Sequence, residues 1–289
     1  MASFSARLSR AYLRRYVRPL VCGDEGAAAA AEALNLRWPW PPAGVAEADP
    51  EIPGEWLRAK SPRRATLLYL HGGAFMAGSP RLYRSSARFF VKAGFDVFTP
   101  TYRLAPEHRF PAALDDVAAA YERLSARGPL TLAGDSAGGG LVVALMLRLR
   151  ARGLPLPRAA ALFSPWTDLS AGGASVRANE GKDPIFTRRA LRLAARQYLG
   201  EASVRDPEAS PLFGDLSGLP PMIVHVGEDE LLLDDSRRLA EHAAAAGTAV
   251  ELRIFTAVPH GWQLGAAFMP EARESLREAA GFLARFAEA

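Results

Sequence analysis

The chain has 289 residues, 49% of them hydrophobic and 23% charged, a composition that excludes an intrinsically disordered protein. Its single cysteine, Cys22, excludes a disulfide framework and a four-cysteine zinc site. No apolar run reaches the ~18 residues that a membrane span needs. The arginines near the N-terminus are not followed by the apolar stretch of a signal peptide, so we expect a cytoplasmic protein.

The positive charge is concentrated at the N-terminus. The net charge is +4, and the first twenty residues hold five arginines and no acid, which leaves the remainder near neutral. A nucleic-acid-binding protein spreads its basic residues over a domain face, so we expect no nucleic-acid partner. Apolar residues at helical spacing predict an amphipathic helix here that ends at Pro19. We expect its arginines to be solvated, rather than to contact an anionic membrane, and we expect no stable membrane insertion.

After residue 50, strand and helix patterns alternate, which predicts one doubly wound, mostly parallel sheet. The short turn at residues 61–64 predicts that the first two strands form an antiparallel hairpin. Residues 170–215 break the alternation, and we expect an insertion there that contains a helix at 187–198. The strand candidates are residues 55–59, 65–70, 96–102, 130–133, 159–163, 222–226 and 250–255, and the helix candidates are 81–93, 112–126, 137–152, 233–246 and 270–287.

A nucleophile pattern joins the strand candidate at 130–133 to the helix candidate that follows it. The residues are Gly134-Asp135-Ser136-Ala137-Gly138, which match the G-x-S-x-G turn of serine hydrolases. Its glycines permit a sharp turn that presents the serine hydroxyl above the carboxyl edge of the sheet. The bare pattern also arises by chance, but this strand–turn–helix context favours Ser136 as a nucleophile over a plain tight turn.

Donors for an oxyanion are expected in the loop His71-Gly72-Gly73-Ala74-Phe75, which follows the strand candidate at 65–70. Glycines let backbone N–H groups approach a substrate oxygen, and the N–H groups of Gly72, Gly73 and Ala137 are the predicted donors. We interpret His71 as a structural residue that holds this loop by hydrogen bonding, because the chemistry of the loop lies in its backbone.

The expected general base is His260. Of the five histidines, it alone follows the last strand candidate, and it comes after both the serine and an acidic cluster. Serine, acid and histidine in that chain order are typical of this kind of hydrolase. We interpret most of the acidic cluster as a solvated turn or as the N-terminus of a helix. The cluster consists of Glu228-Asp229-Glu230 and Asp234-Asp235. The cluster lacks the regularly spaced oxygen ligands and the central glycine of a calcium-binding loop, and the chain lacks the clustered histidines of a metal hydrolase. We therefore expect no metal.

Taken together, residues 50–289 resemble the hormone-sensitive-lipase family of esterases, bacterial family IV, within the α/β-hydrolase superfamily. The resemblance implies an α/β-hydrolase fold, no cofactor, and a triad of serine, acid and histidine. It rests on the loop at His71, on Gly134–Gly139, and on Tyr102-Arg103-Leu104-Ala105-Pro106-Glu107-His108, Phe110-Pro111-Ala112-Ala113, Ser164-Pro165-Trp166 and Ser210-Pro211-Leu212.

The family's Asp-x-Leu-x-Asp motif aligns with Glu230-Leu231-Leu232-Leu233-Asp234, which makes Glu230 the expected catalytic acid and Asp229 the alternative. The resemblance also implies a helical cap. Residues 1–48 would supply its N-terminal helices and a loop, and residues 49–289 would form the catalytic domain, with a cap insertion at about 170–215. Relatives often pair through a sheet edge, so a homodimer is expected.

The sequence thus predicts a carboxylesterase that acts on small-molecule esters with short or medium acyl chains, small lactones or acetylated molecules. A deacetylase or amidase with the same triad is an alternative, because acylation uses the same groups. A non-catalytic ligand receptor is a second alternative, which retention of the whole triad disfavours. We expect five large apolar side chains to form the core of the cap, with the wall of an apolar pocket as the alternative: Trp38, Trp40, Phe186, Leu191 and Tyr198.

Overall fold

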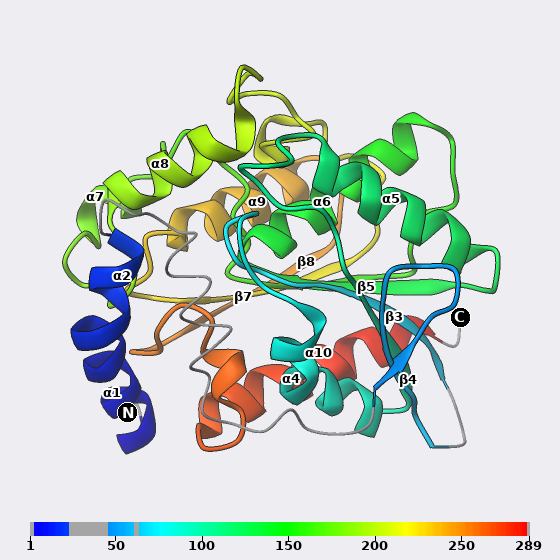
Figure 1. Cartoon of the computed structure of the whole chain (residues 1–289), viewed down its shortest axis with the longest axis horizontal. Coiled ribbons are helices and arrows are strands. Elements are labelled where there is room, and N and C mark those ends of the chain that lie inside the picture. The colour runs from blue at the N-terminus through cyan, green and yellow to red at the C-terminus, as the bar shows by residue number, and fades with distance from the viewer. Residues whose placement is uncertain (1–2, 23–45, 61–63, 288–289) are drawn as a thin grey trace.

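An eight-stranded, mostly parallel sheet forms the centre of the computed structural model, which describes residues 3–22, 46–60 and 64–287 (Figure 1). The strands lie in the order β1-β2-β4-β3-β5-β6-β7-β8, with β1 and β2 antiparallel to their neighbours and the others parallel. This arrangement confirms the predicted α/β-hydrolase fold. Pairing of two copies through an edge strand stays a prediction. The strands are β1 (Glu47–Ala48), β2 (Gly54–Leu57), β3 (Ala65–Leu70), β4 (Phe95–Pro100), β5 (Leu130–Asp135), β6 (Ala160–Phe163), β7 (Met222–Gly227) and β8 (Val250–Phe255).

The predicted hairpin between the first two strand candidates is wrong. β2 pairs with β4, in a register that sets Trp56 opposite Phe98, and β4 separates β2 from β3. Side chains explain this choice of partner, because the Trp56 and Phe98 rings pack 4.8 Å apart and Arg58 bonds the carboxylate of Asp96 at 3.1 Å. Cross-strand contacts of this kind select partners that are remote in sequence.

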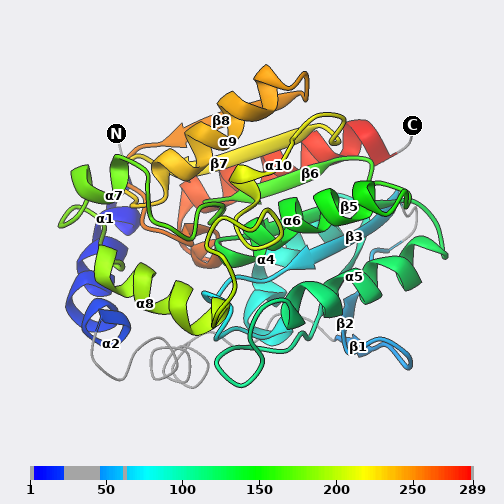
Figure 2. The same ribbon diagram turned by 90° about the horizontal axis from the view of Figure 1, so that it is seen from above.

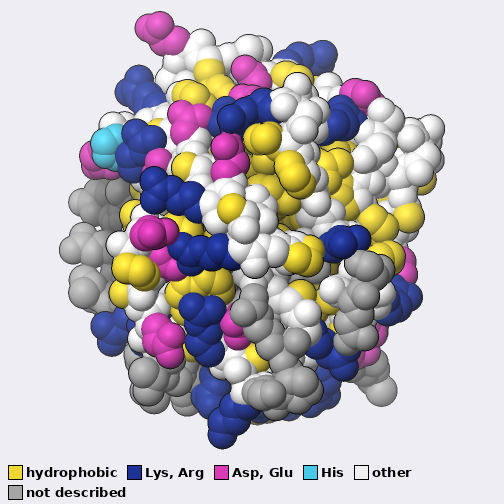
Figure 3. All heavy atoms as spheres, turned by 90° about the vertical axis from the view of Figure 1, so that its right-hand side faces the viewer, with side chains coloured by type: hydrophobic (Ala, Val, Ile, Leu, Met, Phe, Trp, Pro, Cys, Tyr) yellow, Lys and Arg dark blue, Asp and Glu magenta, His cyan; other side chains and the backbone are white. Residues whose placement is uncertain are grey.

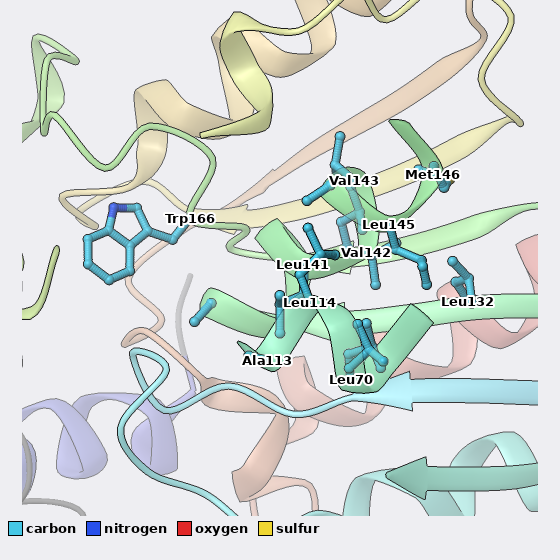
Figure 4. Close-up of a cluster of buried hydrophobic side chains, with 14 of the residues drawn as sticks. Leu70, Ala113, Leu114, Leu132, Leu141, Val142, Val143, Leu145, Met146 and Trp166 are labelled. Carbon is cyan, nitrogen blue, oxygen red and sulfur yellow. The ribbon is translucent and has the colours of Figure 1, made fainter. Parts of the chain in front are cut away.

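Helices cover both faces of the sheet and bury alternate residues of its strands (Figures 1 and 2). Leu68 and Leu70 of β3 face the core beneath α5 (Ala112–Ser125), α6 (Ala137–Ala151) and α9 (Leu233–Ala245). Leu67 and Tyr69 face the opposite core, beneath α4 (Pro80–Lys92) and α10 (Pro270–Ala287). Figure 4 shows the first core, with Leu70 and Leu132 of the sheet against α5 and α6. Burial on both faces explains the continuous apolar strand runs in the sequence.

The N-terminal helix is longer than predicted. It runs through α1 (Phe4–Tyr12), a π-helical turn (Leu13–Val17) and α2 (Arg18–Cys22). Pro19 therefore lies inside the helix rather than at its end. The wide π-helical turn immediately before it alters the hydrogen bonding that proline otherwise disrupts. Trp38 and Trp40, for which a place in the cap was expected, lie outside the described residues.

The segment between β6 and β7 contains the predicted interruption. It holds α7 (Ser175–Ala178), α8 (Arg188–Leu199) and a 3₁₀ turn (Pro211–Phe213). Thr187 begins α8 as an N-cap, because its side chain accepts a hydrogen bond from the N–H of Ala190. α2 packs against α8, so the N-terminal helix and the insertion lie side by side (Figure 2).

The start of α6 passes very close to β3, and this approach yields a stability prediction. A Cβ on Gly138 would lie 2.1 Å from the Leu70 carbonyl oxygen, whereas one on Gly281, inside α10, would meet nothing within 4 Å. We expect Gly138→Ala to lower the free energy of unfolding by about 2–3 kcal/mol. We expect the control, Gly281→Ala, to raise it by about 0.5–1 kcal/mol, because alanine favours the helix. Urea unfolding of both variants measures the difference, and equal effects would contradict the close approach.

Candidate active site

Ser136 occupies a strained turn between β5 and α6. Its φ of 52° lies in the left-handed region, which costs energy for a residue other than glycine. Two hydrogen bonds hold this backbone: the Ser136 N–H donates to Phe163 O at 2.8 Å, and the Trp166 N–H donates to Ser136 O at 2.9 Å. The side chain thus lies at the carboxyl edge of the sheet, at the N-terminus of α6, where the helix dipole favours negative charge.

Glu230 and His260 form a buried hydrogen-bonded pair. Glu230 follows β7 and His260 follows β8, so the parallel pairing of these strands brings the two side chains to the same edge. His260 Nδ1 lies 2.6 Å from Glu230 Oε2. The other carboxylate oxygen, Oε1, accepts hydrogen bonds from the Ser164 hydroxyl at 2.8 Å and from the Gly227 N–H at 2.6 Å. The carboxylate is therefore fixed by two donors and presents its free oxygen to the imidazole.

Asp229, the alternative acid, faces away from this pair. Its carboxylate forms an ion pair with Arg10 of α1, at 2.7 Å, and both side chains are partly exposed. The geometry therefore favours Glu230 over Asp229 as the partner of His260.

The charge of Glu230 alters the titration of His260. Burial of the ring opposes its protonation, but the negative charge of Glu230 and the hydrogen bond to it outweigh burial and raise the pKa of His260 above its usual 6.5. The carboxylates of Asp183 and Asp135 act in the same direction. The site therefore stabilises an imidazolium, which is what a general base must become during a reaction.

The backbone of the His71 loop corrects one predicted oxyanion donor. The Gly72 N–H donates to Asp135 Oδ1 at 3.0 Å and lies 3.1 Å from the Tyr83 hydroxyl, so it is already engaged, which contradicts its expected role. The N–H groups of Gly73 and Ala137 have no acceptor in the described part of the chain, and neither does that of Ala74. Ala74 has a φ of 55° and lines the cavity beside Ser136.

Asp135 anchors this loop from beneath. Besides the Gly72 N–H, its buried carboxylate accepts hydrogen bonds from the hydroxyls of Tyr83 at 2.8 Å and Tyr69 at 3.3 Å. Burial raises the pKa of Asp135 to about 6, although these hydrogen bonds and the charge of His260 act to lower it. Apart from the position of Asp135 in the G-x-S-x-G pattern, no local signal indicates this role, because its tyrosine partners lie 52 and 66 residues away.

His71 has the surroundings of a structural residue. Its ring stacks on Tyr102 at 4.2 Å, Nδ1 lies 2.8 Å from Gly72 O, and burial lowers its pKa to about 4. A neutral, buried histidine that is bonded to its own loop fits the expectation that it holds the loop in place.

Asp183 is a buried acid near the site that the sequence analysis missed. Its Oδ1 accepts from the N–H groups of Ile185 and Phe186, and its Oδ2 accepts from that of Leu231, the residue after Glu230. Burial raises the pKa of Asp183 against the effect of these bonds. Asp183 thus ties the insertion to the loop that carries Glu230. No sequence pattern predicts this role of Asp183, because its hydrogen-bond partners are backbone N–H groups, which every residue except proline has.

A small apolar cavity of about 20 Å³ adjoins Ser136. Phe186 and Leu191 line it, which is the alternative role that the sequence left open for them, and the Phe186 ring also packs edge-on against His260 at 5.0 Å. Tyr198 instead stacks on Phe75 at 3.7 Å and belongs to the core. The cavity is lined by Val21, Ala74, Ser136, Trp166, Phe186, Ala190, Leu191, Ala194 and Leu232.

The chemistry available at this edge is that of a serine, a histidine and a carboxylate with nearby backbone N–H donors. Within residues 3–22, 46–60 and 64–287, no three His, Cys, Asp or Glu side chains cluster as metal ligands do. A helix that meets the length and hydropathy of a membrane span is also absent from those residues.

Comparisons with known proteins agree with this fold. A profile of the alpha/beta hydrolase fold family matches residues 67–264. The chain is 42% identical to an acetyl-hydrolase of Streptomyces hygroscopicus over 234 residues, which cover 79% of this chain and 78% of that one. It is 35% identical to an esterase of Acinetobacter venetianus over 237 residues, which cover 80% and 78%.

Among solved structures, the chain resembles a hormone-sensitive lipase from a metagenome library. The TM-score is 0.88 at 34% identity, and the match covers 97% of this chain and 98% of the other. This likeness extends over the N-terminal helix and the insertion as well as the sheet. The chain therefore belongs to the hormone-sensitive-lipase family of α/β-hydrolase esterases.

Proposed function

We propose that this protein hydrolyses carboxylic esters of small molecules through an acyl-enzyme on Ser136, with His260 as general base and Glu230 as its orienting acid. Membership of an esterase family and the esterase and acetyl-hydrolase relatives support ester hydrolysis as the activity. The observation that carries the assignment of residues is the 2.6 Å contact between His260 Nδ1 and Glu230 Oε2, at the same edge of the sheet as a serine held in a strained turn.

In the first half of the reaction, the Ser136 oxygen bonds to the acyl carbon while its proton passes to His260 Nε2. The imidazolium that forms is stabilised by Glu230, and it then protonates the departing alcohol as the ester bond breaks. In the second half, His260 takes a proton from water, the hydroxyl attacks the acyl carbon, and the Ser136 oxygen leaves with the proton. Atoms balance as ester plus water giving acid plus alcohol.

The negative oxygen of each tetrahedral intermediate requires hydrogen-bond donors. We assign this role to the N–H groups of Gly73 and Ala137, together with that of Ala74 in place of Gly72. Support comes from the positions of these groups: Ala137 opens α6 beside the nucleophile, and Ala74 lines the same cavity as Ser136. Asp135 positions the donors indirectly, because it fixes the Gly72 N–H that precedes them.

The substrates that fit best have short acyl chains, acetyl first. A cavity of about 20 Å³ holds little more than one water-sized group, and apolar side chains surround it. We assign α1, α2, α7 and α8 to the predicted cap, because Val21 of α2 and Leu191 of α8 both line this cavity. Closed over the serine in this way, the cap disfavours long acyl chains.

Hydrolysis of p-nitrophenyl esters from acetyl to palmitoyl tests the activity. We expect kcat/KM to be largest for the shortest esters and Ser136→Ala to abolish turnover while its far-ultraviolet circular dichroism matches the parent. We expect Leu191→Ala, which widens the cavity, to shift the preference toward longer chains. Leu199→Ala is the control, since Leu199 is a buried leucine of the same helix that does not line the cavity. Turnover retained by Ser136→Ala, or a preference for palmitoyl in the parent, would contradict the proposal.

Substitution of the two candidate acids separates their roles. We expect Glu230→Gln to lower kcat by on the order of 10²–10⁴-fold, because the amide no longer stabilises the imidazolium. We expect Asp229→Asn to change kcat by less than about threefold, since it removes only a partly exposed ion pair with Arg10. Steady-state kinetics on p-nitrophenyl acetate measure both variants, and the reverse order would assign the acid to Asp229.

The pH dependence follows from the raised pKa of His260. The base must be neutral to accept a proton, so kcat/KM rises as pH increases through that pKa, and we expect the midpoint of this acid limb above pH 6.5. Removal of the negative charge in Glu230→Gln lowers the pKa, so its midpoint moves to lower pH although its maximum falls. A pH profile of kcat/KM for both proteins gives the result, and identical midpoints would mean that Glu230 does not act on the base.

A further inference from the structure

An apolar stripe runs along the exposed side of the N-terminal helix. It consists of Phe4, Leu8, Tyr12, Tyr16 and Leu20, and we call it the N-terminal stripe. Their exposed fractions are 75%, 60%, 56%, 60% and 39%. A row of large apolar side chains that is exposed on a single helix commonly marks a binding surface, whereas single exposed residues do not. α1 and α2 lie at one end of the molecule (Figures 1 and 2).

The π-helical turn keeps this stripe on one side of the helix. In a regular α-helix, residues four apart are offset by about 40°, so five such residues spread over about 160° of the circumference. The wider turn at Leu13–Val17 takes more residues per turn and offsets that drift in the middle of the stripe. Tyr12 and Tyr16, on either side of its start, consequently remain neighbours, with rings 5.1 Å apart.

Polar contacts on the opposite side hold the stripe outward. Ser3 bonds Glu271 of α10 through both its N–H, at 2.7 Å, and its hydroxyl, at 2.8 Å. Arg10 pairs with Asp229, and Arg18 donates to the carbonyl oxygen of Asp183 at 2.7 Å. With these contacts along its length, the helix cannot rotate to bury the stripe without breaking them.

Positive charge flanks the N-terminal stripe, and no acidic side chain of the same helix neutralises it. Arg7, Arg14 and Arg15 are exposed, and residues 1–22 contain no acid. The face at the other end of the molecule is different, because basic and acidic side chains are interspersed there (Figure 3). Apolar side chains bordered by arginines on one helix are complementary to a surface that is both apolar and anionic.

We propose that the N-terminal stripe docks this protein on the surface of anionic lipid bilayers. The aromatic and leucine side chains enter the boundary between headgroups and acyl chains, and Arg7 and Arg15 contact the lipid phosphates, whereas Arg14 donates to the carbonyl oxygen of Lys182 at 2.8 Å. Binding is peripheral and reversible, because only one face of the helix takes part. It differs from the sequence-based expectation that the arginines are merely solvated, and the exposed aromatic row is the reason.

Docking would also position the active site. Val21, one residue beyond the end of the stripe, lines the cavity beside Ser136, so the bound helix would hold that cavity close to the lipid. This consequence rests on the proposed esterase function, whereas lipid binding itself does not.

The test is co-sedimentation of the full chain with vesicles of phosphatidylcholine alone or mixed equally with phosphatidylglycerol. The same assay on Ser136→Ala separates lipid binding from catalysis. We expect binding to the mixed vesicles, weakened by salt, and little binding to phosphatidylcholine. Leu8→Ser should weaken binding about fivefold or more, and Arg7→Gln/Arg15→Gln about tenfold or more.

Matched controls carry the same changes elsewhere. Ile254→Ser alters an exposed apolar residue of β8, and Arg81→Gln/Arg277→Gln removes two exposed arginines of α4 and α10. These variants should bind like the parent, and every variant except Ser136→Ala should retain the parent's activity on p-nitrophenyl acetate. Absence of binding, equal binding to both vesicles, or equal losses in variants and controls would overturn the proposal. A different outcome would assign the N-terminal stripe to a second copy of the chain. In that case the parent would not bind vesicles but would form dimers, and Leu8→Ser would dissociate them.

Discussion

The fixed carboxylate of Glu230 is the contact on which the rest of the site depends. Ser164, at the end of β6, and the Gly227 N–H, at the end of β7, hold one of its oxygens, and His260, after β8, takes the other. A carboxylate with two fixed donors on one oxygen has little freedom to turn, so the imidazole orientation is set before substrate arrives. Such preorganisation means that the groups need not rearrange when charge develops.

The parallel sheet makes this convergence possible. β3, β5, β6, β7 and β8 all end at the same edge, and each is followed within a few residues by a residue of the site or of its support. The buried polar groups at this edge have hydrogen-bond partners. The carboxylate of Asp135 accepts hydrogen bonds from Tyr83, Tyr69 and Gly72, as a buried carboxylate requires. The N-terminal helix and the insertion then enclose the serine with apolar side chains.

Much of this arrangement is predictable from local sequence. Apolar runs predicted β2 to β8, and the G-x-S-x-G turn indicated Ser136, because each of these signals lies within a few residues. The order of serine, acid and histidine along the chain indicated His260. Pairing of β2 with β4 was not predictable in this way, since it depends on contacts such as Trp56 with Phe98. The engagement of the Gly72 N–H and the burial of Asp183 depend equally on partners that only the folded chain brings near.

The central claim, that Ser136 is the nucleophile served by His260 and Glu230, is tested most directly by covalent labelling. The protein is treated with a p-nitrophenyl alkylphosphonate, release of nitrophenolate is titrated, and the modified peptide is identified by mass spectrometry. The account predicts one equivalent of label, on Ser136, with labelling greatly slowed in Glu230→Gln. A label on another residue, or rapid ester turnover by a protein that takes up no label, would contradict it.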